Sequence, residues 1–245
     1  MPGNSASVFA TVYQCVGAAV ILPLYCITFV WAAGKDGYNP SGREVRNSGM
    51  LLPVVVLGYV VPTALMFYPW NNLDFFQWSA AFWQAAPLYP NLFVYLASLA
   101  GTTSPASKNS NSVNHVKGLY VLTGALSVAS HFALLYISAA SGNPALSLSS
   151  VLLPDETARM KDTAHGLFWI FQWDFLGTFG AVLLWTWVSV VEMHRVSGNG
   201  HLTKSLAATV AIGIATVLGG PGAALSAAWY WRETKMVFTP RVKAA

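Results

Sequence analysis

An acidic residue, Asp174, lies deep inside an apolar segment that begins near residue 164 and is long enough to cross a bilayer. About ten residues of helix precede it there, which places it roughly 15 Å from the end of the segment. An ionised carboxylate at that depth costs about 2.5 kcal/mol or more, and no Lys or Arg is available to compensate it. We therefore expect Asp174 to be a neutral carboxylic acid, which is a proton donor. The alternative is a structural Asp, hydrogen-bonded to a neighbouring helix.

Aromatic residues surround this acid along the same segment, at Trp169, Phe171, Trp173 and Phe175. The face of an aromatic ring attracts cations, by ~2 kcal/mol or more in a desolvated site. An acid beside aromatic walls in a water-poor cavity suits the generation and guidance of a carbocation. The expected substrate pocket contains eight residues: Trp169, Phe171, Gln172, Trp173, Tyr59, Asn71, Trp83 and Gln84.

Three further polar residues are candidates to orient the acid or to accept the final proton, namely His131, Gln172 and Asp74. His131 lies near the middle of an apolar segment, where a lone His more often joins two helices through a hydrogen bond. Asp74 follows Asn71 and Asn72 at the edge of another segment, where Asn and Asp favour helix N-caps. Both readings stay open for each residue.

Motifs for metals and nucleotides are missing from the sequence. There is no Asp-Asp-x-x-Asp or Asn-Asp-x-x-Asp run to bind Mg²⁺ and diphosphate, no His-Glu-x-x-His and no paired Cys-x-x-Cys. We expect no metal site and no cofactor, and therefore proton chemistry carried by side chains.

The composition predicts the architecture that must position these residues. Hydrophobic residues make up 55% of the 245-residue chain and charged residues 9%, where soluble domains carry ~25% charged residues. In lipid, every backbone polar group needs an internal partner, and the apolar runs are too long for barrel strands. We expect an all-α, polytopic transmembrane helical bundle, with residues 1–245 as one domain. The six expected spans cover 8–32, 48–69, 76–101, 116–140, 164–191 and 203–231.

Two segments leave the number of spans open. Residues 141–163 are long enough for an interfacial helix after Pro154, which would be a seventh element. The last span contains Gly213, Gly219, Gly220 and Gly222, and we expect close packing through small residues with a bend. The other reading is a broken helix that lines a cavity.

The excess of basic residues fits a membrane rather than nucleic acid. The formal net charge is +4, and Arg232, Lys235, Arg241 and Lys243 follow the last apolar run, where cations meet anionic headgroups. With six spans, six Lys and Arg residues fall on the side of the N-terminus and seven on the other side. The positive-inside rule therefore gives no orientation.

Short aromatic and proline motifs resemble a known family. They are Val8-Phe-Ala-Thr-Val-Tyr-Gln14, Gly58-Tyr-Val-Val-Pro-Thr63, Met66-Phe-Tyr-Pro-Trp-Asn71 and Phe171-Gln-Trp-Asp174. This pattern is similar to fungal integral-membrane terpene cyclases, near the ascofuranone- and macrophorin-type meroterpenoid group. The Asn-x-x-Trp-Glu motif of the better-known indole-diterpene group is missing, so the catalytic Glu of that group has no counterpart here.

The resemblance implies protonation of an epoxide or alkene of a prenyl chain, ring closure through a carbocation, and residence in the endoplasmic reticulum membrane of a fungus. Asp174 matches the acid of the Gln-Trp-Asp stretch. The substrate would be a lipophilic prenylated aromatic compound or linear terpenoid that enters from the bilayer. The alternatives are a proton-coupled transporter that uses Asp174 as its proton site, and a membrane scaffold without catalysis.

Overall fold

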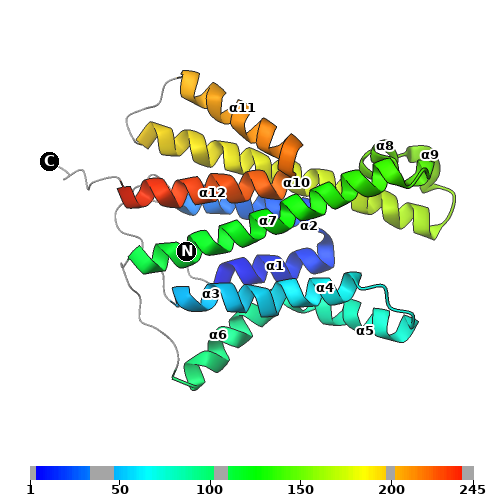
Figure 1. The fold of residues 1–245 in the computed structure, drawn as a ribbon, viewed down its shortest axis with the longest axis horizontal. Helices are drawn as coiled ribbons and strands as arrows, with labels where there is room; N and C mark the ends of the chain where they lie inside the picture. The colour runs from blue at the N-terminus through cyan, green and yellow to red at the C-terminus, as the bar shows by residue number, and fades with distance from the viewer. Residues whose placement is uncertain (1–3, 34–46, 102–109, 197–201, 239–245) are drawn as a thin grey trace. The chain divides into compact units, whose positions relative to one another are not determined.

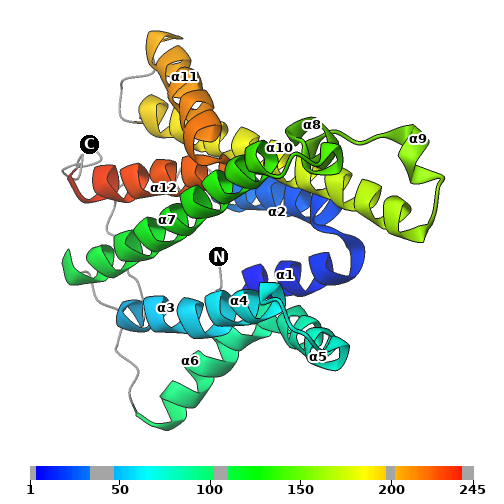
Figure 2. The ribbon, with the colours of Figure 1, turned by 45° about the vertical axis from the view of Figure 1, so that its right-hand side comes forward.

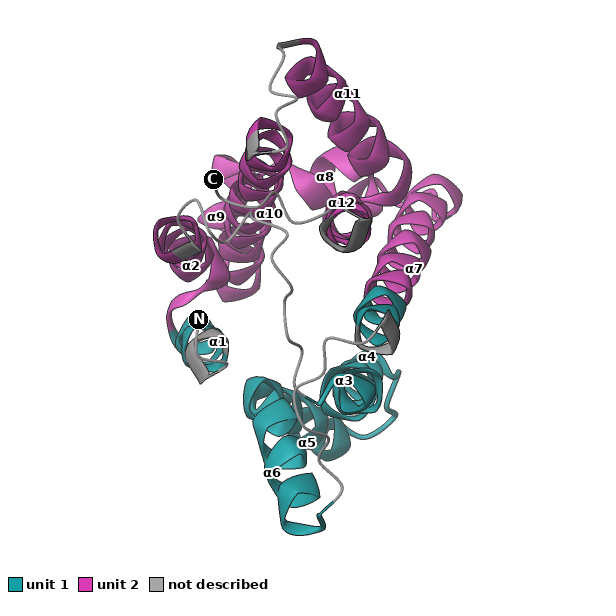
Figure 3. Ribbon diagram, turned by 90° about the vertical axis from the view of Figure 1, so that its left-hand side faces the viewer, with its two compact units in different colours: residues 1–15, 40–119, 239–245 teal, residues 16–39, 120–238 magenta. Residues whose placement is uncertain are grey.

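The computed structural model describes residues 4–33, 47–101, 110–196 and 202–238, and all the regular structure in these ranges is helical (Figure 1). The predicted all-α class is confirmed. The chain forms two compact units (Figure 3), one of residues 1–15, 40–119 and 239–245 and one of residues 16–39 and 120–238. The charged loop 34–46 and the cations of the C-terminal tail, Arg241 and Lys243, lie outside the described residues.

Unit 1 contains a long apolar helix that changes its winding half-way. Pro62 has no N–H to donate to the carbonyl one turn before it, and a π-helical turn precedes this proline. Asn72 then caps the next helix, because its side chain accepts a 2.8 Å hydrogen bond from the Asp74 N–H. The elements are α1 (Asn4–Val16, to residue 15), α3 (Ser48–Val55), η2 (Val56–Val60), α4 (Val61–Phe67), α5 (Leu73–Gln84), η3 (Ala86–Leu88) and α6 (Tyr89–Leu99).

Unit 2 is organised around one 34-residue helix, α10 (Thr163–Val196), which contacts α2, α11 and α12 along its length. Two short helices, α8 and α9, pack near its first turns (Figure 2). A short helix thus follows Pro154, as expected for segment 141–163. The other elements are α2 (Ala18–Ala33), α7 (Ser110–Ala140, from residue 120), η4 (Pro144–Leu146), α8 (Leu148–Leu152), α9 (Glu156–Arg159), α11 (Leu202–Gly219) and α12 (Pro221–Phe238).

Three of the expected spans are confirmed as helices long and apolar enough to cross a membrane. They cover Ser48–Phe67, Val113–Ala140 and Thr163–Arg195 among the described residues. The other three expected spans are interrupted: 8–32 at Gly17, 76–101 around η3, and 203–231 at Gly220. Each interruption leaves shorter helices in place of a single span.

The break at Gly220 corrects the expectation of one bent helix over 203–231. Gly220 has φ +85°, a left-handed conformation that glycine adopts without steric cost, and Pro221 then starts α12. Helices α11 and α12 meet at this turn and pack against each other as a hairpin (Figure 1). The small residues serve close packing as well, since a Cβ added at Gly222 would lie 2.7 Å from Ser127 Oγ on α7. The broken-helix reading is the one that the structure supports.

The hairpin turn should tolerate a side chain far less well than a nearby helical glycine. Gly220→Ala forces alanine into a left-handed conformation 3.3 Å from the His131 ring, and we expect it to lower the melting temperature in detergent. Gly213→Ala is the matched control, because its Cβ meets no atom within 4 Å, and it should stabilise α11 by about 0.5–1 kcal/mol. Equal melting temperatures for the two variants would contradict the role of the turn.

Candidate active site

Asp174 holds the first turn of α2. Its Oδ1 accepts a 2.8 Å hydrogen bond from the backbone N–H of Ala19. That N–H is one of the groups that a helix start leaves without an internal partner. Gly17, at φ +108°, ends α1 immediately before this turn, and a Cβ added there would lie 3.0 Å from the same carboxyl oxygen. The acid therefore caps a break in the first expected span from the neighbouring helix α10.

A second glycine, one turn further along α10, allows this close approach. A Cβ added at Gly177 would lie 2.8 Å from the Ala19 Cβ, closer than real side chains come. Asp174 and Gly177 are three residues apart, and therefore share the face of α10 that packs on α2. Asp174 is half-buried on this face.

His131 supplies a hydrogen-bond partner at the other break, the turn at Gly220 between α11 and α12. Its Nε2 lies 3.0 Å from the carbonyl oxygen of Val217 in the last turn of α11, so Nε2 carries the proton and donates it. The last turn of a helix leaves carbonyls without internal donors. Gly220 gives His131 room, because a Cβ there would lie 3.3 Å from the ring. The structure thus places His131 as a helix–helix link.

Gln172 is buried, with 6% of its surface exposed, and faces a third helix end. Its Nε2 donates toward the carbonyl oxygens of Ser150 (2.8 Å), Leu153 (3.0 Å) and Val151 (3.1 Å), at the end of α8. Gln172 follows the pattern of Asp174 and His131, since each satisfies backbone groups where a helix stops or starts.

The space on the Gln172 side of α10 is a cavity of about 600 Å³. Two expected substrate-binding residues, Trp169 and Gln172, line it, and Asp174 and Trp173 are not among its lining residues. The guanidinium of Arg159 lies 5.0 Å from the centre of the Trp169 ring. Phe171 and Trp173 are 66% and 50% exposed. The aromatic side chains around Asp174 therefore do not close over it within unit 2.

Two carboxylates near this cavity are poor proton donors. The side chain and backbone of Thr157 hold the pKa of Asp155 below its usual range through hydrogen bonds. The backbone N–H of His165, and then its ring at 2.8 Å, do the same for the pKa of Asp162. Neither residue was a candidate from the sequence, because both lie in a loop. Both residues precede α10, so Asp174 stays the candidate acid within the apolar helix.

The remaining predicted residues lie in unit 1, where two of them, Tyr59 and Trp83, are linked through Thr63. The hydroxyl groups of Tyr13 and Tyr59 are 2.5 Å apart. Trp83 Nε1 donates to Thr63 Oγ1 at 3.0 Å, and that hydroxyl donates to the Tyr59 carbonyl at 2.7 Å. Asn71, Asp74 and Gln84 are exposed within the unit. The predicted site residues are therefore divided between the two units.

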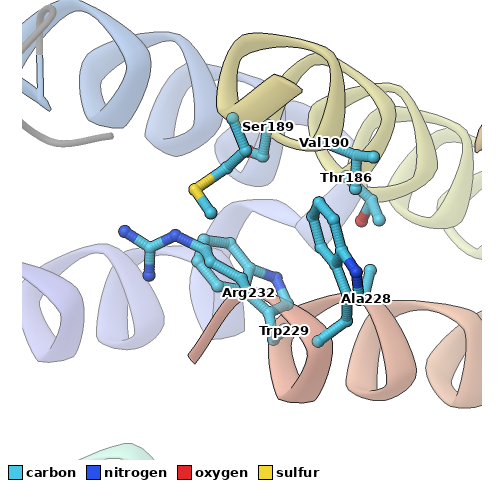
Figure 4. Close-up of a pocket in the computed structure, with 8 residues that line it drawn as sticks. Thr186, Ser189, Val190, Ala228, Trp229 and Arg232 are labelled. Carbon is cyan, nitrogen blue, oxygen red and sulfur yellow. The ribbon is translucent and has the colours of Figure 1, made fainter. Parts of the chain in front are cut away.

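A buried ion pair on α12 was not expected from the sequence. Arg232 was expected at the headgroups, but Arg232 and Glu233 are 6% and 3% exposed, and their charged groups lie 3.2 Å apart. The Arg232 guanidinium lies 4.6 Å from the centre of the Trp229 ring, which also packs against Trp185 of α10. Figure 4 shows Arg232 and Trp229 opposite Ser189 and Thr186 of α10. The spacing Trp-x-x-Arg-Glu could have indicated this contact, because it places the Trp229 ring one helical turn before the Arg232 cation.

No group of three or more His, Cys, Asp or Glu side chains that could hold a metal ion occurs in the part of the chain that the structure describes.

Comparison with known proteins connects this arrangement to a family, because the CtvD domain matches residues 3–238. The chain belongs to the CtvD domain family. This CtvD-domain chain is 27% identical over 252 residues to the terpene cyclase ascI of Acremonium egyptiacum, an alignment that covers 93% of the chain and 64% of that protein. It is 28% identical over 250 residues to the terpene cyclase ctvD of Aspergillus terreus, covering 92% of the chain and 67% of that protein.

The resemblance to fungal terpene cyclases is confirmed by these matches. A third relative is an FAD-dependent monooxygenase, verC1 of Penicillium polonicum, 22% identical over 226 residues. That match covers 90% of the CtvD-domain chain but 27% of the monooxygenase. The chain also spans only about two thirds of the length of the two cyclases. No solved structure matches it.

The buried pair on α12 should be sensitive to the loss of one partner. Arg232→Met or Glu233→Gln takes the opposite charge away from a buried group, and each should destabilise the protein by about 3–5 kcal/mol. Arg232→Met combined with Glu233→Leu should cost less than either single change, because no buried charge is left behind. Thermal unfolding of the three variants in detergent measures this, and additive losses would contradict the pairing.

Proposed function

We propose that this chain acts as a membrane-embedded terpene cyclase of the meroterpenoid type, which protonates an epoxide or alkene of a prenyl chain and guides the ring closure. The relatives named terpene cyclase support the activity. The observation that carries the proposal is the position of Asp174, which lies eleven residues after the start of the 34-residue apolar helix α10, with one oxygen already engaged by the Ala19 N–H.

In this proposal, the two carboxyl oxygens of Asp174 have different roles. Oδ1 accepts the N–H of Ala19, so Oδ2 is the oxygen that carries the proton toward the substrate. When the proton moves to an epoxide oxygen, the carboxyl group becomes negative. The N-terminal end of α2 carries a partial positive charge, and together with the N–H it stabilises that negative charge. In this proposal, the break at Gly17 exposes the N–H groups at the start of α2 that stabilise the carboxylate.

The cyclisation itself would use no outside reactant. Protonation opens the epoxide C–O bond and leaves a carbocation, a double bond of the chain attacks it to form a ring, and loss of a proton from carbon ends the reaction. The proton given is thus returned, and the product is an isomer of the substrate. Aromatic rings of α10, including Trp169 and Trp173, would stabilise the cation. His131 and Gln172 bind backbone carbonyls at other helix ends of unit 2, and Asp74 lies in unit 1, so a role for these three residues in the chemistry stays a prediction.

The monooxygenase relative favours an epoxide over an alkene as the group that receives the proton. Its matched part is about a quarter of that protein, so a domain of this kind occurs within an FAD-dependent monooxygenase chain. Flavin monooxygenases insert one oxygen atom into a substrate, and epoxidation of a prenyl double bond is such a reaction. We infer that oxygenation comes immediately before cyclisation.

Three long apolar helices support association with a membrane. We propose residence in the endoplasmic reticulum of a fungus, with a lipophilic prenylated or terpenoid substrate that reaches the protein from the bilayer.

The cap geometry makes one pair of variants decisive for Asp174. Asp174→Asn keeps an oxygen that can accept the Ala19 N–H but has no acidic proton, so we expect a folded protein with at least a 100-fold lower rate. Asp174→Ala removes both functions and should also lower the melting temperature. Microsomes that contain each variant are incubated with an epoxidised farnesyl phenol, and ring products are measured by mass spectrometry.

The control for this pair is Thr178→Ala, four residues further along α10 and outside the proposed chemistry. It should retain the wild-type rate. If Asp174→Asn cyclises the substrate at the wild-type rate, the carboxyl group is a structural cap and the assignment of the acid is wrong.

A further inference from the structure

The cavity of about 600 Å³ lies on the side of α10 that packs near α8 and α9, and Asp174 is not among its lining residues. Two residues of α-helix turn the chain by about 200°, so Gln172, which faces α8, and Asp174, which faces α2, point to opposite sides of α10. The volume is within the usual range of small-molecule sites, ~300–1,000 Å³. The cavity can therefore hold a ligand of its own, independent of proton transfer from Asp174.

Gln172 brings an unused hydrogen-bond acceptor to this cavity. The residue is only 6% exposed, and its Nε2 donates to three carbonyl oxygens at the end of α8. No group in the described part of the chain donates to its Oε1. An acceptor that stays unpaired in a buried place is unfavourable. A ligand that carries an N–H or O–H group toward Gln172 would remove this cost.

Further acceptors line the same cavity. Asp155 and Glu156 contribute carboxylates at its exposed end. His165 contributes a ring whose Nδ1 lies 2.8 Å from Asp162 Oδ2. The carboxylate accepts the proton of this Nδ1, so the Nε2 of the neutral ring is an acceptor as well. Together with Gln172 Oε1, these groups favour a ligand with several N–H donors.

The charges of the lining favour a cation over an anion. The lining contains two carboxylates and one ammonium group, that of Lys161. Hydrogen bonds from Thr157 hold the pKa of Asp155 below its usual range, so this carboxylate is ionised. A further cation, Arg159, pairs with Glu156 at 3.2 Å and does not line the cavity. A primary ammonium group combines a positive charge with three N–H donors.

We propose that this cavity, the α8–α10 cavity, binds a primary ammonium group. One N–H donates to Gln172 Oε1, and the carboxylates of Asp155 and Glu156 supply the opposite charge at the exposed end. The apolar part that carries the ammonium group contacts Leu153 and Phe168. An ethanolamine lipid headgroup and a free amine both present this chemistry. The inference goes beyond the proposed function and does not depend on it.

Saturation-transfer NMR on the full chain in detergent micelles tests the proposal with three probes of similar shape. 2-Phenylethylamine has a charge and three N–H donors, its N,N,N-trimethyl derivative has the charge alone, and 2-phenylethanol is neutral. We expect the amine to bind with about a ten-fold lower Kd than the alcohol, because hydrogen bonds to charged groups are stronger. The trimethyl derivative should bind more weakly than the amine, since it cannot donate to Gln172. Equal binding of the three probes would overturn the proposal.

The sign of the charge is tested by two variants with opposite expected effects. Asp155→Asn removes a carboxylate but keeps an oxygen that can cap α9, and it should raise the Kd of the amine about two- to five-fold. Lys161→Gln removes the like charge and should lower this Kd by a similar factor. Glu192→Gln is the matched control, because this acid of α10 does not line the cavity, and it should leave the Kd unchanged. Weaker amine binding in Lys161→Gln would point to an anion and overturn the proposal, as would equal effects of Asp155→Asn and Glu192→Gln.

Competition in the same micelles distinguishes the two sources of the ammonium group. If phosphoethanolamine displaces 2-phenylethylamine, the site is assigned to a lipid headgroup, and nanodiscs that contain phosphatidylethanolamine should then weaken amine binding relative to nanodiscs of phosphatidylcholine alone. If spermidine displaces the probe and phosphoethanolamine does not, the site is assigned to a free amine. Phosphocholine has no N–H donor, and displacement by phosphocholine as strong as by phosphoethanolamine would overturn the proposal.

Discussion

The constraint on which this structure depends is that a broken helix leaves backbone groups without a partner in that helix, which in a bilayer no water would supply. Each such group costs several kcal/mol without a partner. The chain breaks its expected spans at Gly17 and at Gly220, and in both places a polar side chain from another helix supplies the missing partner. Asp174 accepts an N–H at the start of α2, and His131 donates to a carbonyl at the end of α11. Both residues hold the arrangement of unit 2.

The same constraint explains why structural and catalytic roles are hard to separate here. A carboxyl group that caps a helix is fixed in position, and it lies at the positive end of the helix dipole, which favours its negative form. An acid that gives up a proton to a substrate needs both properties. The cap therefore fixes the carboxyl group and stabilises the anion that proton transfer leaves behind, whereas the neutral form from which the proposed acid starts is favoured by the apolar surroundings of α10. His131 differs, because its Nε2 proton is already given to a carbonyl.

The sequence predicted the helical class and the three long spans because these depend on the length and composition of apolar runs, which are local properties. It left a break at Gly220 open as the alternative to a bent helix, because an apolar run has the same composition whether it is continuous or folds back on itself. The catalytic and substrate-binding roles of the candidate residues stay a prediction. Asp174, His131 and Gln172 were candidates because polar residues are rare in apolar segments. Their hydrogen-bond partners are backbone groups distant in sequence, and the spacing of residues does not predict such partners. The burial of Arg232 and Glu233 depends on the packing of α10 against α12, and was missed for the same reason.

The hairpin also bears on the topology of the chain. A pair of antiparallel helices returns to the membrane face from which it departed, whereas a single span would have delivered the C-terminal tail to the opposite face. If the helices at 48–67, 110–140 and 163–196 each cross once, and the interrupted segment 73–99 crosses once as a whole, Arg159 and Lys161 fall on one face and the other eleven Lys and Arg residues on the opposite face. Under the positive-inside rule, this imbalance would orient the face with eleven cations toward the cytosol.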